Sequence, residues 1–158
     1  IIWLKAISKL INSKYSVICR PHPHQMKNNY DLIKTIESYG ISVDLVESRA
    51  MSEFYRGGVL TLADYGGTIF SSIYCKRPVI LLNLSEHNEL APKKRTDILA
   101  REYLTNIDPE YENTTTLKNI LNSLPVEIEK MTQARHKLFD DDALLMMKSS
   151  QEVSGFLK

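Results

Sequence analysis

The chain has few cysteines, no long apolar run and almost no net charge. Its two cysteines, Cys19 and Cys75, stand in no CxxC or Cys/His ligand spacing, which fits a reducing, cytosolic environment. No apolar run approaches the roughly 20 residues that span a bilayer, so the sequence predicts neither a signal peptide nor a transmembrane anchor. A formal charge of +1 over 158 residues creates no field that would attract nucleic acid, and we expect no dedicated nucleic-acid binder.

Length and apolar content predict one domain. With 158 residues, of which 43% are apolar, the chain can bury one substantial core but hardly two. The sequence contains no internal repeat, low-complexity segment or linker, so we expect a single domain over 1–158. Because the first residue is Ile1 and a helical pattern begins at once, we also expect the chain to be a piece of a longer protein.

Helical and strand patterns alternate along the chain. Apolar spacing predicts helices over 2–11, 32–39, 51–56, 68–75 and 89–101, and strands over 15–19, 41–46, 59–63, 79–82 and 103–106. Three further helical stretches follow Asn113, separated at Pro125 and at 140–142. Strands that alternate with helices indicate a doubly wound parallel sheet, and the wholly apolar run 79–82 is typical of a strand covered on both faces. The predicted fold is therefore α/β, a Rossmann-like parallel sheet with helices on both faces and a helical C-terminal tail.

The first candidate loop, which we call the histidine loop, follows the predicted strand 15–19. It consists of Arg20, Pro21, His22, Pro23 and His24. Its prolines fix their own φ and push the preceding residues toward extended geometry, which holds the side chains at low entropy. In an extended loop, the arginine and both histidines project to one side. A rigid basic loop at the C-terminal end of a strand suits an anion, because open α/β sheets bind ligands at these ends.

The histidines also have structural interpretations. His22 can stabilise a leaving phosphate, either as an imidazolium or as a neutral N–H donor, or it can be a structural hydrogen-bond partner. We expect His24 to be a solvated loop residue. His87 and His136 lack a comparable setting and are expected at the surface.

The second candidate loop, which we call the glycine loop, follows the predicted strand 59–63 and leads into a helix. It consists of Asp64, Tyr65, Gly66, Gly67 and Thr68. Glycines let the backbone approach a ligand, and the N–H groups and positive dipole end of the following helix favour a phosphate. The alternative is an ordinary strand-to-helix turn, in which the glycines relieve strain and the threonine caps the helix. If the two loops face each other, they form two walls of one diphosphate site.

Metal binding has little support in the sequence. His22 and His24 have Asp31 as their nearest carboxylate, and no further His, Cys or Asp set has ligand spacing. The acidic run 140–142 lacks the alternating oxygen ligands and the turn glycine of a calcium loop. We therefore expect no metal and no cofactor.

Both loops resemble motifs of the CDP-glycerol glycerophosphotransferase family, bacterial enzymes of teichoic-acid and capsule-polymer synthesis. The resemblance spans most of the chain and is carried by YSVICRPHP at 15–23, DYGGTIF at 64–70 and KRPVI at 76–80, with a weaker echo in RHKLFDDDA at 135–143. This family is similar to two-domain glycosyltransferases of the GT-B architecture, in which the C-terminal Rossmann-like domain holds most of a nucleotide-activated donor. The resemblance implies that this chain is that domain.

The resemblance also implies roles for the two loops. His22 is expected to contact the diphosphate of a CDP-linked donor with Arg20 in support, so these are the candidate catalytic residues, and the glycine loop is expected to cradle the same diphosphate. The family's catalytic base is a histidine of the N-terminal domain, which has no counterpart here, so we expect the chain alone to be inactive. The implied reaction transfers glycerol phosphate to a polymer or lipid-linked acceptor. From the resemblance we expect a cytoplasmic protein, with the reaction at the inner face of the cell membrane.

Two alternatives remain open at this stage. Gly66 and Gly67 stand where the family usually has two serines, so backbone donors remain while two hydroxyls are lost. Related GT-B enzymes, including UDP-N-acetylglucosamine 2-epimerases and capsule polymerases, carry glycines or hydroxyl residues at this turn, which keeps a UDP- or CMP-linked sugar as an alternative donor. The second alternative is a non-catalytic interaction domain that retains the fold.

Overall fold

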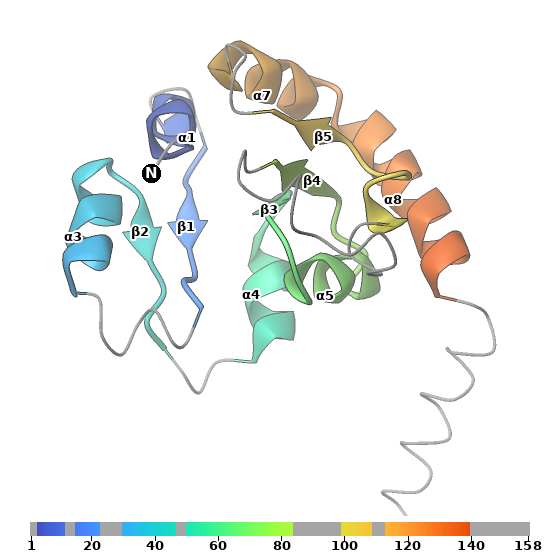
Figure 1. The fold of residues 1–158 in the computed structure, drawn as a ribbon, viewed down its shortest axis with the longest axis horizontal. Coiled ribbons are helices and arrows are strands. Elements are labelled where there is room, and N and C mark those ends of the chain that lie inside the picture. The colour runs from blue at the N-terminus through green and yellow to red at the C-terminus, as the bar shows by residue number, and fades with distance from the viewer. Residues whose placement is uncertain are drawn as a thin grey trace, which may run out of the picture.

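The computed structural model describes residues 3–11, 15–22, 30–46, 50–83, 99–108 and 113–139. Over these residues short parallel strands alternate with helices, which confirms the predicted α/β class (Figure 1). The helices are α1 (Leu4–Ile11), α3 (Tyr30–Ser38), α4 (Met51–Gly57), α5 (Thr68–Tyr74), α7 (Asn113–Asn122) and α8 (Leu124–Leu138). The strands are β1 (Ile18–Cys19), β2 (Ser42–Val43), β3 (Thr61–Ala63), β4 (Val79–Leu82) and β5 (Asn106–Ile107).

The strands form two parallel sheets. β1 pairs with β2, and in the other sheet β4 lies between β3 and β5. β1 is the strand of the first sheet that lies nearer the second sheet (Figure 1). Cys19, the last residue of β1, is within electrostatic range of Asp64, which follows β3. The chain thus runs outward from β1 to β2, returns to β3 beside β1, and then runs outward in the opposite direction to β4 and β5.

The two sheets share a hydrophobic core. Side chains near β1 and β3, among them Cys19 and Leu62, pack against the same buried cluster. The cluster itself draws on the start of α1 and on α3, β4, β5 and α7, with Trp3, Ile7, Ile36, Ile41, Ile80, Leu82, Ile107, Leu117 and Ile120. Because this core spans both sheets, it fixes the ends of their strands relative to one another.

β4 is buried on both faces, as its apolar sequence predicts. Ile80 and Leu82 enter the shared core. Val79 and Leu81 enter a second cluster with side chains of α5 and α8, because successive residues of a strand point to opposite faces. The central strand is therefore covered by helices from either side.

Several predicted strands are longer than the strands of the structure, and β3, for example, begins at Thr61 rather than at Val59. The prediction of a strand over 41–46 is wrong beyond Val43, because the Asp44 side chain accepts a hydrogen bond from the Val46 N–H at 3.3 Å and turns the chain. Leu45 and Val46 are accordingly 47% and 44% exposed. The prediction of a strand over 15–19 is right only for its last two residues, because only Ile18 and Cys19 pair with β2. Ile18 is nevertheless 53% exposed.

Local hydrogen bonds set other boundaries. The last strand begins at Asn106 rather than at Tyr103, because the Tyr103 N–H bonds to the Ala100 carbonyl in a turn. Gly40 follows the end of α3 with a φ of 76°, the left-handed conformation that glycine commonly adopts after a helix. The break that was predicted at Pro125 falls at Ser123 instead, and Pro125 lies in the first turn of α8.

The end of α5 uses a residue in the left-handed region. Lys76 has a φ of 56°, its N–H bonds to the Ile73 carbonyl at 3.0 Å, and the Arg77 N–H bonds to the Ser72 carbonyl at 3.0 Å. These two bonds form a Schellman motif, in which glycine is the usual residue at the position of Lys76.

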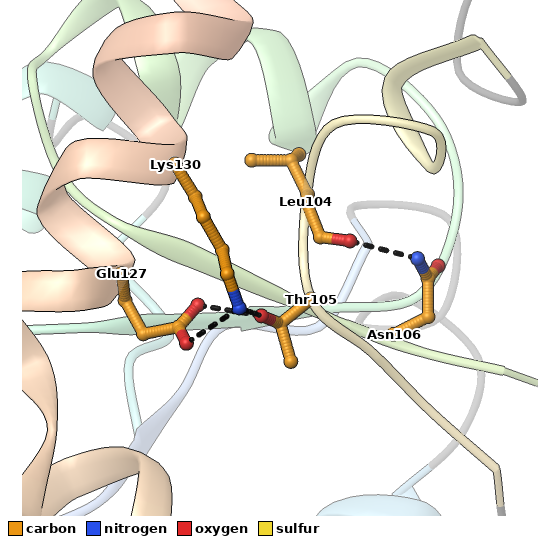
Figure 2. A network of polar contacts seen from close by, with 5 residues as sticks. All are labelled: Leu104, Thr105, Asn106, Glu127 and Lys130. Carbon is orange, nitrogen blue, oxygen red and sulfur yellow. Dashed lines mark hydrogen bonds and ion pairs between the residues drawn. The ribbon is translucent and has the colours of Figure 1, made fainter.

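A buried carboxylate fastens α8 to the chain just before β5 (Figure 2). The Thr105 hydroxyl donates to Glu127 Oε2 at 2.7 Å, and Lys130 Nζ donates to Thr105 Oγ1 at 2.6 Å and to Glu127 Oε1 at 3.1 Å. Asn106, the next residue, instead donates from Nδ2 to the Leu104 carbonyl at 2.8 Å. Thr105 thus faces α8, which leaves Asn106 on the other side of the strand.

Several predicted features lie outside the described residues. These are His24, His87, the acidic run 140–142 and the predicted helix up to residue 98, of which the described end, Leu99 and Ala100, is helical. In the part of the chain that the structure describes, none of the helices has the length and apolar content needed to cross a membrane.

Candidate functional site

The candidate site lies at the C-terminal ends of the strands. A polar residue follows each strand directly, namely Arg20, Asp44, Asp64, Asn83 and Asp108 in the order β1 to β5. The direction in which successive strands are added reverses between β1 and β3, and open α/β sheets bind ligands at such a switch point. The histidine loop follows β1 and the glycine loop follows β3, so the two predicted loops are the ones that flank it.

Arg20 contacts protein groups on two sides. Its guanidinium lies 3.7 Å from the Asp44 carboxylate and donates to the Val46 carbonyl at 3.3 Å. It also stacks on the Phe54 ring at 5.8 Å from the centroid. Only 12% of the Arg20 side chain is exposed. The structure therefore ties Arg20 to β2 and α4.

His22 is placed differently from Arg20. Pro21, between them, is buried, whereas His22 is exposed. The imidazole is therefore accessible from solvent while the neighbouring guanidinium is held within the fold. The structure describes the histidine loop as far as His22, so the expected alignment of Arg20 with His24 lies outside the described residues.

The glycine loop contains one position that requires glycine. Gly66 has a φ of 92°, in the region that residues with a Cβ rarely adopt. Gly67 instead has a φ of −66° and a ψ of −19°, and a Cβ built on it would meet no atom within 4 Å. Ahead of the glycines, the Asp64 Oδ1 accepts a hydrogen bond from the Tyr65 N–H at 2.7 Å. The loop is thus shaped by Asp64 and Gly66, while Gly67 has room for a side chain.

α4 joins the two loops. The Phe54 ring makes a cation–π contact with Arg20 of the histidine loop. The adjacent Tyr55 hydroxyl donates to the Thr68 carbonyl of the glycine loop at 3.2 Å. The two rings meet edge to face at 6.0 Å. Burial raises the pKa of Tyr55, although its contact with Thr68 and the charge of Arg20 act in the opposite direction. One short helix therefore holds both predicted loops.

The two loops also influence each other electrostatically. Burial raises the pKa of the Cys19 thiol, and the Asp64 carboxylate raises it further. The effect requires the negative charge of the glycine loop to be felt at the residue that precedes the histidine loop. The ends of β1 and β3 are therefore neighbours at the switch point.

Sequence reasoning missed Arg101, which the fold brings to the glycine loop. Its guanidinium donates to the Asp64 carbonyl and to Asn83 Oδ1, and it donates to Asn106 Oδ1 at 3.2 Å. It also lies 4.1 Å from the centroid of the Tyr65 ring. No local pattern marks this residue, because its partners lie up to 37 positions away in the chain. Its place just before β5 is the only signal that the sequence carries.

The arrangement is suited to binding an anion. An exposed imidazole, a glycine-shaped loop at the start of a helix, and two arginines behind them surround one switch point. Among the described residues, no group of three or more His, Cys, Asp and Glu side chains is placed to hold a metal ion. Comparison of the chain with protein-family models, with curated proteins and with solved structures gave no match.

Proposed function

We propose that this chain is the donor-binding domain of a transferase that moves glycerol phosphate from a CDP-linked donor to a cell-surface polymer. One observation carries the proposal: the histidine loop and the glycine loop flank the same switch point between β1 and β3. The sequence motifs of these loops resemble those of one transferase family. In this proposal the chain is half of a GT-B fold, and its partner domain supplies the rest of the site.

The proposed chemistry is phosphoryl transfer without a metal. An acceptor hydroxyl oxygen forms a bond to the donor's β-phosphorus, the bond from that phosphorus to the bridging oxygen breaks, and CMP leaves with the electron pair. The hydroxyl proton passes to a base of the partner domain. His22, exposed beside the switch point, donates an N–H to the phosphate oxygens and stabilises the charge that develops on them. The glycine loop binds the same diphosphate through its backbone.

Arg20 has a different role in this proposal from that of His22. Its contacts with Asp44, Val46 and Phe54 favour a positioning function, in which the guanidinium orders the chain from which His22 projects. The positive charge still contributes to the potential at the switch point, though the Asp44 carboxylate offsets much of it. We therefore assign the direct phosphate contact to His22.

A nucleotide sugar is the second candidate donor, and the glycine loop is the observation that favours it. A serine at Gly66 would have to adopt a φ of 92°, so the loop departs from the two-serine pattern of the glycerophosphotransferases. With a nucleotide sugar, the bond that breaks is sugar C1–O rather than P–O. The proposed acceptor in either case is a polymer or a lipid-linked acceptor at the inner face of the cell membrane.

Calorimetric titration of the chain with CDP-glycerol, CDP, CMP, UDP and a UDP-sugar tests the proposal. Binding of CDP-glycerol and CDP but not UDP supports the first donor, and preference for the UDP compounds supports the second. A folded chain that binds none of the five would contradict both and favour a non-catalytic interaction domain. Circular dichroism on the same sample provides the control for folding.

A further inference from the structure

Arg101 links three strand ends of the second sheet. Through its two terminal nitrogens it donates to the Asp64 carbonyl after β3, to the Asn83 side chain after β4 and to the Asn106 side chain at the start of β5. The Asn106 side chain returns a bond to the Arg101 carbonyl at 2.7 Å. Hydrogen bonds thus fix Arg101 both at its backbone carbonyl and at its guanidinium group.

The partners of Arg101 are themselves held in place. Asn83 donates from Nδ2 to Asp108 Oδ1 at 2.7 Å, and its carbonyl accepts the indole N–H of Trp3 at 3.2 Å. Its N–H bonds to the Ile107 carbonyl at 2.9 Å. Asn83 is therefore held by several hydrogen bonds, and through Arg101 it restrains Asp64 at the start of the glycine loop.

The same guanidinium also restrains the Tyr65 side chain. It lies 4.1 Å from the centre of the ring, within the range of a cation–π contact. Tyr65 stands directly before Gly66, whose backbone has the freedom that glycine allows. By stacking on Tyr65 and bonding to Asp64, Arg101 thus restrains the residues that precede the two glycines, whose own backbones are the most flexible part of the loop.

We infer that Arg101 is a positioning residue of the glycine loop, which holds Asp64 and Tyr65 so that the loop keeps one conformation for its anionic ligand. Arg101 acts through the loop and not on the ligand. The planar guanidinium is essential, because a lysine ammonium cannot bond three acceptors in a fixed fork and stack on a ring at once. The ligand part of this inference rests on the proposed function, whereas the positioning is a property of the ligand-free chain.

Hydrogen–deuterium exchange of the ligand-free chain tests the positioning directly. In Arg101→Ala, amides of residues 64–70 should exchange about tenfold faster, since charge-assisted hydrogen bonds hold the loop. Amides of β4 should keep their rate, which a general loss of structure would not allow. Arg101→Lys should resemble Arg101→Ala more than the wild type. Unchanged exchange over 64–70, or an equal increase in β4, would overturn the inference.

A second variant guards against loss of folding. Tyr65→Leu removes the ring from a half-exposed position and keeps the hydrogen bond from Arg101 to the Asp64 carbonyl. The amide exchange rate over residues 64–70 should rise by a few-fold in this variant. In the double variant with Arg101→Ala, the rate increase should be smaller than the product of the increases in the two single variants. Independent, multiplying effects would overturn the inference.

CDP titration then links the loop to its ligand. If the wild type binds CDP, Arg101→Ala should bind it about tenfold more weakly, at a salt dependence equal to that of the wild type because no phosphate contact is lost. Faster loop exchange with unchanged CDP affinity would overturn the ligand part. If the wild type binds no CDP, the proposed function fails, and the exchange data alone decide the positioning.

Discussion

The Cys19 thiol is coupled to the Asp64 carboxylate: burial raises the pKa of Cys19, and the charge of Asp64 raises it further. Cys19 closes β1 and Asp64 follows β3, so this relationship spans the switch point. It provides a chemical means of testing whether the two predicted loops are neighbours in solution.

Asp64→Asn should lower the pKa of Cys19. The thiolate is the reactive form, so the pH profile for alkylation of Cys19 by iodoacetamide should shift to lower pH in the variant. Asparagine retains the Oδ1 that accepts the Tyr65 N–H, which preserves the local turn. Mass spectrometry of the alkylated Cys19 peptide measures the rate, with Cys75 as an internal control. A Cys19 profile identical in both proteins would show that the loops are apart.

The two glycines of the glycine loop should respond differently to serine. Gly66→Ser forces a Cβ onto a φ of 92° and should destabilise the fold by about 1–2 kcal/mol. Gly67→Ser places the side chain in open space at a helical φ, and because it reduces the freedom of the unfolded chain it should be neutral or stabilise by a few tenths of a kcal/mol. Urea unfolding of the matched pair gives both values. Equal losses in the two variants would contradict the loop conformation.

Lys76→Gly should stabilise the chain. Lys76 occupies the left-handed position of a Schellman motif with a φ of 56°, where glycine avoids a steric cost of about 1 kcal/mol. Lys76→Ala keeps that cost and removes only the exposed amine, so it serves as the control. Thermal unfolding should place Lys76→Gly above both the wild type and Lys76→Ala. A melting temperature for Lys76→Gly at or below that of Lys76→Ala would refute the assignment.

The Thr105 hydroxyl should matter more than its methyl group. Thr105→Val leaves the buried Glu127 carboxylate without one of its bonds and should cost about 1–3 kcal/mol. Thr105→Ser keeps the hydroxyl that Glu127 and Lys130 share (Figure 2) and should cost less than about 1 kcal/mol. Urea unfolding compares the two, and a Thr105→Val as stable as Thr105→Ser would count against the network.

The sequence predicts which helices and strands this fold contains better than it predicts where they begin and end. The apolar run of β4 could be interpreted from the sequence because a strand covered on both faces has no polar alternation. The short β2 could not, because its end is set by the Asp44 side chain turning back to the Val46 N–H. Leu45 and Val46 have strand-forming side chains, and nothing local distinguishes them from buried ones.

The same contrast holds at the candidate site. Both loops could be located from the sequence, since Pro21 and Gly66 mark backbone geometry within a few residues. The partners of Arg20 and Arg101 could not, because each guanidinium bonds to groups more than 15 residues away. Whether an arginine faces a ligand or the protein is decided by tertiary contacts, which leave no periodic trace in the chain.

Binding of CDP to the wild-type chain and to His22→Ala tests the central claim most directly. A hydrogen bond to a charged group contributes about 1.5–3 kcal/mol, so calorimetry should show CDP binding that weakens by roughly tenfold or more in His22→Ala. His22→Gln, which keeps an N–H donor, should lie between the two. Binding by the wild type with an unchanged dissociation constant in His22→Ala, or no binding by a folded wild type, would contradict the account.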